Sequence, residues 1–383
     1  MKKEGYKPHV AAAVEALAST GGQIMPPVMG AAAFIMAEII GQPYKNIMKA
    51  AIIPAILYFL AVYVIVHLTA LKGKIDYSEE KAKSDKQPIL AVIKEGWYYV
   101  IPIAVLIYLL LQGLSPFKAA YYSIFSMLIV YLIAKRDFSL DFVKKIFRSI
   151  VEGTYDTVSI AIACAASGIV IGIITLTGVG AKLSNLIITI SNGQLLIALV
   201  LTMITGIILG MGLPTTAAYL VLASVVAPGL VEMGLSQITA HMFVFFYGCI
   251  STITPPVALA SYVAAGIAGA DVGKVGWTAF LFGLPSYVLP FMFAYGPSLL
   301  MQGTAVEIIT NLIGGIIGIY AIAASIVGYY KVDLPMAYRI PMFVAGILLI
   351  DQGYVTDIIG IAALALLYGL IVLRMRKEKG ANV

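Results

Sequence analysis

The chain has 383 residues, of which 61% are hydrophobic and 11% are charged, and its mean hydropathy is +0.97. A water-soluble domain of this size could not hide so much apolar surface in one core, so the composition excludes soluble enzymes and soluble binding domains. The formal net charge of +6 comes from Lys and Arg grouped in a few loops without interleaved aromatic residues, which indicates membrane orientation and no nucleic-acid partner.

Apolar runs of about 20 residues recur from end to end, and an α-helix of that length crosses roughly 30 Å of hydrocarbon. The sequence therefore predicts an all-α polytopic membrane protein with about 10 spans and a re-entrant hairpin. In chain order, the predicted elements are a helix at 9–19, a break at 20–27, a helix at 28–41, spans at 45–70, 97–113, 117–134 and 156–177, a semi-polar connection at 178–193, a hairpin at 199–230, an interrupted helix at 235–270, and spans at 273–294, 305–330, 335–350 and 355–373.

Basic residues predict the orientation of these spans. Lys and Arg cluster in the loop 71–95, in the stretch 135–150 and in the tail after the last span, and the positive-inside rule places all three in the cytoplasm. Following the chain from these loops places both termini in the cytoplasm, Lys45 outside and Lys274 inside.

Two distant segments resemble each other: PPVMGAAAFIMAEIIGQPYKNIMKAA (26–51) and PPVALASYVAAGIAGADVGKVGWTAF (255–280). They share the opening PPV and, at one constant offset, a lysine and two alanines, and each leads into a long apolar span. Because the charge pattern places Lys45 and Lys274 on opposite sides, the sequence predicts an inverted-topology repeat with broken helices, which is the usual architecture of secondary transporters.

The prelude to each PPV predicts a break at membrane depth. STGGQIMPP and STITPP lose amide donors at their prolines, and unwound backbone survives there only inside protein or beside a wet cavity. Freed carbonyls and hydroxyls suit a sodium ion, whereas the half-helix N-termini expected at about Val28 and Val257 suit an anion. The alternative is that both are proline kinks in a packed bundle.

The segment LGMGLPTT predicts the tip of the hairpin, opposite the second break. The candidate sodium ligands are Ser19, Thr20, Gly21, Gly22, Pro26, Gly210, Gly212, Thr215, Ser251, Thr252, Thr254 and Pro255, and the candidate substrate contacts are Pro27, Val28, Pro214, Thr216 and Pro256. Glu15 and Glu38 are buried acids that either tune a cation or proton path or lie near the interface. Transition-metal ligand spacing is absent from the sequence, and no other cofactor is expected.

At these residues the chain resembles a known family. GYKPHVAAAVEALASTGGQIMPPVMGAAAFIMAEIIGQPY, LGMGLPTTAAYLVLASVVAPGL, CISTITPPVALASYVAAGIAGAD and the tail YRIPMFVAGILLIDQG are similar to the large permease domain of tripartite ATP-independent periplasmic (TRAP) transporters, in particular the fused permeases that pair with TAXI-type binding proteins. The resemblance implies an elevator mechanism in a bacterial or archaeal inner membrane. It also implies sodium coupling and a periplasmic binding protein that delivers an organic anion of the carboxylate or amino acid class.

The resemblance also divides the chain into four regions. Residues 1–70 are the remainder of a first repeat, with the broken helix 9–41 and the span 45–70, and its hairpin is missing. Residues 71–193 form the cytoplasmic loop and scaffold spans, 194–294 form the second repeat, and 295–383 form C-terminal scaffold spans.

In that family, the small-subunit helices, several scaffold helices and a first Ser/Gly-rich hairpin precede the equivalent of GYKPH. We therefore expect an upstream permease region, either in a longer reading frame or in another chain. The alternative is a remnant that does not transport. An intramembrane enzyme is not expected, because the sequence contains no GxSG, HExxH or DDxxD motif.

Overall fold

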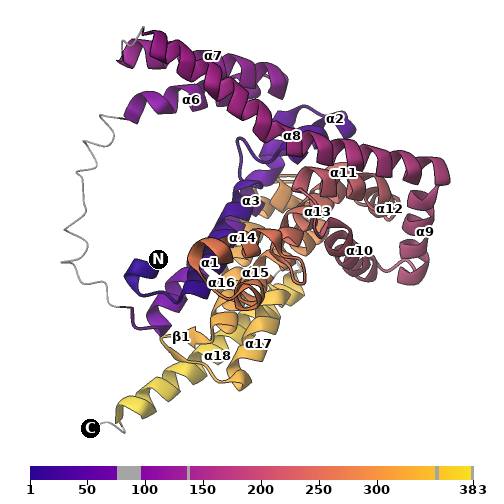
Figure 1. Ribbon diagram of the computed structural model, residues 1–383. Helices are drawn as coiled ribbons and strands as arrows, with labels where there is room; N and C mark the ends of the chain where they lie inside the picture. Colours follow the sequence, from indigo (N-terminus) through magenta and orange to yellow (C-terminus); the bar gives the residue numbers. More distant parts are fainter. Residues whose placement is uncertain (76–95, 136–138, 350–352, 381–383) are drawn as a thin grey trace.

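The computed structural model describes residues 1–75, 96–135, 139–349 and 353–380, and they are helical almost throughout (Figure 1). Two strands of two residues each, β1 (Tyr329–Tyr330) and β2 (Val332–Asp333), form an antiparallel turn. The prediction of an all-α polytopic membrane protein is confirmed.

The α-helices are α1 (Pro8–Gly22), α2 (Ala31–Ile39), α3 (Tyr44–Lys72), α6 (Val100–Leu111), α7 (Pro116–Lys135), α8 (Leu140–Thr177), α9 (Val179–Ser191), α10 (Leu195–Gly210), α11 (Thr215–Val225), α12 (Ala227–Glu232), α13 (Gln237–Ile250), α14 (Leu259–Ala268), α15 (Val272–Tyr295), α16 (Ala305–Val327), α17 (Met336–Leu348) and α18 (Tyr354–Gly380). Short 3₁₀ turns are η1 (Lys2–Glu4), η2 (Trp97–Tyr99), η3 (Ser251–Ile253) and η4 (Pro297–Leu300).

Within the described ranges, five helical stretches are long and apolar enough to cross a membrane, or six if one bent pair counts as a span. The five are Tyr44–Lys72, Pro116–Ala134, Val272–Tyr295, Ala305–Val327 and Thr356–Leu373. Several other predicted spans correspond to shorter apolar helices, among them Gln237–Ile253 and Met336–Leu348. Most of the predicted loop 71–95 lies outside the described residues.

Three predicted boundaries were wrong. α1 continues through Gly22, because the Gln23 amide still donates to Thr20 O and glycine is tolerated where α1 packs closely. α2 begins only at Ala31, because Met29 has a φ of 54° and Gly30 is extended. The connection predicted at 178–193 is largely the helix α9, which begins after the left-handed Gly178.

The two segments that resemble each other contain the same order of elements. The helices α1, α2 and α3 of the first segment correspond to α13, α14 and α15 of the second. When the two segments are aligned so that Pro26 matches Pro255, the helices of each pair begin within one residue of each other. Both breaks contain a cis bond between their two prolines, and each has a residue of positive φ two positions later, at Met29 and at Ala258. The inverted orientation of the two copies remains a prediction.

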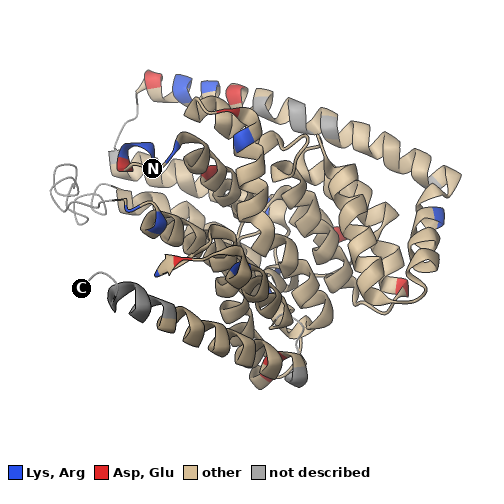
Figure 2. Cartoon of the chain, turned by 90° about the horizontal axis from the view of Figure 1, so that it is seen from below, with Lys and Arg blue, Asp and Glu red and all other residues tan. Residues whose placement is uncertain are grey.

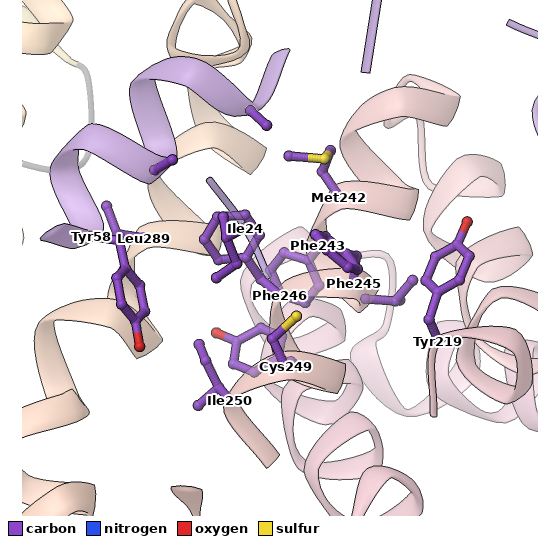
Figure 3. Close-up of a cluster of buried hydrophobic side chains, with 14 of the residues drawn as sticks. Ile24, Tyr58, Tyr219, Met242, Phe243, Phe245, Phe246, Cys249, Ile250 and Leu289 are labelled. Atoms are coloured by element: carbon purple, nitrogen blue, oxygen red, sulfur yellow. The ribbon is translucent and has the colours of Figure 1, made fainter. Parts of the chain in front are cut away.

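α13 lies at the centre of the core. Thr239 to Ile250 are all buried, so this helix is covered on every side, with Phe243, Phe245 and Phe246 fully enclosed (Figure 3). Rings on α13 pack edge to face with Phe291 and Phe293 of α15, at centroid distances of 5.6 and 5.3 Å. Since lipid tails are as apolar as leucine, such packing stabilises a membrane bundle mainly through close contact. The second break follows directly on this buried helix.

Lys and Arg gather mostly on the side of the molecule where both termini lie (Figure 2). This distribution agrees with the predicted clustering of basic residues. Which side faces the cytoplasm remains a prediction.

Candidate functional site

The two breaks meet inside the protein. The Thr20 and Thr252 hydroxyl oxygens are 3.5 Å apart, although the residues are 232 positions apart in the chain. α1 packs along both α14 and α15 and also contacts η3, which brings the end of the first half-helix against the second break. Thr20 is 1% exposed and Thr252 is half-buried, so the hydroxyl pair is largely enclosed by protein.

The hydroxyls of the second break direct their protons into the helix. Thr252 Oγ1 donates to Cys249 O at 2.7 Å, and Ser251 Oγ donates to Gly248 O at 2.8 Å. Thr254 Oγ1 donates to Ile250 O at 2.8 Å and is also paired with Tyr287 OH at 2.5 Å, so its oxygen is engaged within the protein. A hydroxyl that has donated its proton keeps its lone pairs for another group. Thr20 is then the donor in its pair with Thr252. The break thus presents oxygen lone pairs, the ligands that hard cations prefer.

Prolines decide which backbone carbonyls are left over. In a helix, the carbonyl of Thr252 would accept from residue 255 or 256, and both are prolines without an amide proton. The carbonyl of Ser251, one residue earlier, accepts from Thr254 N at 3.2 Å. The carbonyl of Gln23, which holds the position of Thr252 in the first segment, accepts from Gly30 N at 2.8 Å. The Thr252 carbonyl is therefore an oxygen that no helical amide can reach.

Two tyrosines bind the carbonyls that follow the prolines, and the sequence analysis missed them. Tyr44 OH contacts Pro27 O at 3.0 Å and Val28 O at 2.9 Å, and Tyr262 OH donates to Pro256 O. These carbonyls are already engaged, so they are not free for a ligand. The only signal in the sequence was one tyrosine shortly after α2, at the start of α3, and one tyrosine within α14.

The second half-helices begin without side-chain caps. Neither Gly30, the N-cap of α2, nor Ala258, the N-cap of α14, offers a side-chain hydrogen bond to the first turn. α13, α15 and α16 are capped by Ser236, Asp271 and Thr304, whereas α1, α3, α10 and α11 also lack a side-chain cap. In α2 the Ala33 amide donates to Gly30 O at 3.0 Å, and the earlier amides of a helix without a side-chain cap favour an anion. These amides begin at Ala31 and Leu259, two to three residues later than predicted.

The hairpin tip packs on the second break. An ideal Cβ built at Gly210 would lie 2.6 Å from Ser251 Oγ, and one at Gly212, where φ is +77°, would lie 3.8 Å from Val257. Pro214 is the N-cap of α11, and Thr215 and Thr216 are half-buried in its first turn. The structure thus brings the hairpin and STITPP together. Across the described ranges, no second hairpin faces Ser19.

The remaining predicted residues lie at or beyond the first break. Gly21 is buried against the Tyr58 ring, Pro26 is half-buried, and Gly22 is exposed. Pro255 is half-buried in the second break, between η3 and α14. Glu38 is exposed near the end of α2, so its predicted burial was wrong.

A cleft of about 850 Å³ runs between α1 and α14 toward the first break. Alanines form much of its walls, and Ser19 and Glu15 face it, with Ser19 Oγ donating to Glu15 Oε1 at 3.5 Å. Both side chains are exposed, which corrects the prediction that Glu15 is buried. Lys2 lines the mouth and binds Ala268 O, at the end of α14, at 2.6 Å. The cleft carries charged groups at its mouth and reaches Ser19, the residue before Thr20.

Metal ligation of the transition type has no counterpart among the described side chains, where no group of three or more His, Cys, Asp or Glu could hold an ion. Cys249 is buried beside Thr252, and its carbonyl accepts the Thr252 proton.

Comparison with known proteins gives two findings. A profile of the family described as "Tripartite ATP-independent periplasmic transporter, DctM component" matches residues 1–308. The chain is similar to the isethionate TRAP transporter permease protein DctMQ of Oleidesulfovibrio alaskensis, with 22% identity over 276 residues that cover 72% of this chain. The match covers 42% of that relative, so this chain corresponds to less than half of its length.

Proposed function

The chain belongs to the DctM family of TRAP transporter permeases, and we propose that it carries ion- and anion-binding elements of a sodium-coupled symporter that imports an organic anion. Its family is a class of transporter permeases, not of enzymes. The observation that carries the proposal is the meeting of the two breaks at Thr20 and Thr252, 3.5 Å apart. A proline kink needs no partner, whereas a shared site requires one.

The cation is assigned to the second break. Thr252 supplies a hydroxyl whose proton is used by Cys249 O and a carbonyl that no helical amide can reach. Ser251 supplies a further hydroxyl oxygen with a committed proton, whereas Thr254 Oγ1 is already paired with Tyr287 OH at 2.5 Å. The hairpin tip at Gly210 closes the site from the other side. Several neutral oxygens without their own counter-charge suit a monovalent cation such as sodium.

The anion is assigned to the uncapped starts of α2 and α14. Their first amides carry partial positive charge, and a sodium ion nearby strengthens the attraction for a carboxylate or an amino acid. Binding of the cation and binding of the anion are coupled, because the two opposite charges stabilise each other in the same enclosed region. Movement of the two breaks as one unit against the remaining helices would make this an elevator.

Membership of the family supports a periplasmic binding protein as a partner. We propose a periplasmic binding protein of the TAXI type as donor of the anion, and an upstream permease region that supplies the hairpin for the first break. The location is a bacterial or archaeal inner membrane with both described ends of the chain in the cytoplasm, as the basic clusters suggest.

The test uses sodium itself as the probe. The purified chain is melted in sodium chloride and in choline chloride at equal ionic strength, since a ligand that binds only the folded state stabilises it by about 2.7 kcal/mol at 100 times its Kd. We expect stabilisation by sodium that Thr252→Val weakens. Equal melting temperatures in both salts would remove the ion site from this chain.

Transport is tested separately, with the complete permease and its binding protein in proteoliposomes. We expect uptake of the binding protein's ligand only with an inward sodium gradient. Equal uptake without that gradient refutes the coupling while leaving the family membership untouched.

A further inference from the structure

A second pocket lies far along the chain from the breaks, between α16, α17 and α18. Its volume is about 290 Å³, and its aliphatic wall includes Ile317, Ala321 and Ala324 on α16, Met342 on α17 and Ile371 on α18. Figure 1 shows these helices together on the side of the molecule next to β1. Every lining residue follows residue 308, where the family match ends, so the pocket is not a feature of the matched region.

The helices around the pocket are suited to a hydrocarbon environment by their length and composition. α16 and α18 both contain stretches long and apolar enough to cross a membrane. Side chains on these helices are exposed on the protein surface, with Ile313 52%, Ile361 53% and Leu366 65% exposed. In a bilayer such residues face lipid tails. Water does not fill an apolar cavity of this kind, whereas an acyl chain matches its walls.

One end of the pocket is aromatic. Tyr320, Tyr330 and Tyr368 line it, with ring centroids 6.1 Å apart for the first pair and 6.0 Å for the second, both edge to face. Tyr320 comes late in α16, and Tyr330 belongs to the β1–β2 turn that follows it. Tyrosines with an apolar ring and a polar hydroxyl gather where hydrocarbon meets headgroups. The pocket therefore has an apolar body and an interfacial mouth.

The same end is basic. Lys331 forms the exposed tip of the turn directly after Tyr330. Just past Ala324, Arg339 Nε donates to Ser325 O at 2.6 Å, and Lys72 Nζ donates to Val327 O at 2.6 Å. Against these three cations the turn carries one acid, the exposed Asp333. The excess of positive charge complements a phosphate.

We propose that this pocket binds one acyl chain of an anionic phospholipid, with the phosphate beside Lys331. The pocket holds the chain, the three tyrosines surround the glycerol level, and the cations attract the headgroup. Because Lys72 ends α3 and the pocket is built on α16, the lipid would link the end of a helix from the first repeat to the C-terminal helices. The inference does not depend on the proposed sodium site.

The experiment titrates the delipidated full chain with phosphatidylglycerol and with phosphatidylcholine and counts bound lipids by native mass spectrometry. Ile317→Trp fills the pocket, and Ile313→Trp, one turn earlier on α16 and outside the pocket lining, is its matched control. Lys331→Asn removes the charge at the mouth, and asparagine tolerates the φ of 58° at that position.

We expect one tightly retained phosphatidylglycerol in the wild type and in Ile313→Trp, and its loss in Ile317→Trp. Lys331→Asn should weaken the binding of phosphatidylglycerol about fivefold, which is the effect of one basic residue near an anionic surface. The binding of phosphatidylcholine should not change. Equal retention in Ile317→Trp overturns the proposal, as does equal affinity for the two lipids in the wild type. A lipid-free dimer that Ile317→Trp dissociates would overturn it in favour of a second copy as occupant.

Discussion

The contact between the hairpin tip and the second break can be probed at Gly210. This residue ends α10, and an ideal Cβ there would lie 2.6 Å from Ser251 Oγ and 2.9 Å from Ser251 Cβ. Both distances are shorter than real Cβ contacts. Gly210→Ala must therefore push α10 away from η3 or displace Ser251, whose hydroxyl is bonded to Gly248 O at 2.8 Å.

The expected magnitude comes from two opposing effects. An extra methyl in a packed interior destabilises by about 1–3 kcal/mol. Alanine is favoured over glycine inside a helix by about 1 kcal/mol, and by less at the final residue. We therefore expect Gly210→Ala to lower the free energy of unfolding by about 1–2 kcal/mol, or about 5- to 30-fold in the equilibrium constant.

The assay measures the melting temperature of purified chain with and without sodium. Gly172→Ala in α8 is the matched control, since its Cβ would meet nothing within 4 Å, and we expect it to be neutral or slightly stabilising. Adding Ser251→Gly to Gly210→Ala removes both clashing atoms and leaves Ala218 at 3.6 Å as the next neighbour.

The double variant should be more stable than the sum of the two single effects predicts, because the Ser251 side-chain atoms that the new methyl group would meet are then absent. Strict additivity, or a Gly210→Ala protein as stable as Gly172→Ala, would show that the hairpin does not rest on Ser251.

The remaining predictions concern the breaks and one helix start. Thr252→Val should raise the sodium concentration needed for half-maximal stabilisation, because a methyl replaces an oxygen, and an unchanged sodium titration would remove Thr252 from the site. Tyr44→Phe should destabilise the chain by about 1–3 kcal/mol, because it leaves the two carbonyls after the first proline pair without their donor. Tyr63→Phe, on the same helix but 66% exposed, should change the melting temperature little. Thr304→Ala should lower the free energy of unfolding by about 0.5–2 kcal/mol, because it breaks the capping box with Glu307, and an unaltered denaturation midpoint would contradict this.

The helices and the two breaks were predictable because they depend on local chemistry. Long apolar runs form helices in a bilayer whatever surrounds them, and a pair of prolines removes amide donors wherever it stands. The boundaries were less predictable. The helix α1 continues through Thr20 and Gly21, where the missing side chain of the glycine allows close packing against Tyr58. No short-range sequence pattern carries that information.

The candidate site was predictable in part. The sequence led to the residues of both breaks and to the hairpin tip, since serines, threonines, glycines and prolines are unusual within apolar runs. It did not lead to Tyr44 and Tyr262, whose partners are carbonyls that any residue type would provide. It gave Glu38 as a buried acid or an acid near the interface, and the structure shows that carboxyl group exposed.

The sequence by itself determined that this chain crosses a membrane as helices, and that two of these helices are interrupted by matched proline pairs. Only the tertiary structure decided that the interruptions meet, with Thr20 against Thr252, and that Gly210 lies on Ser251. The physical reason is that a proline removes its own backbone donor, whatever the rest of the chain does. Contact between residues 232 positions apart depends instead on how α1 packs along α14 and α15.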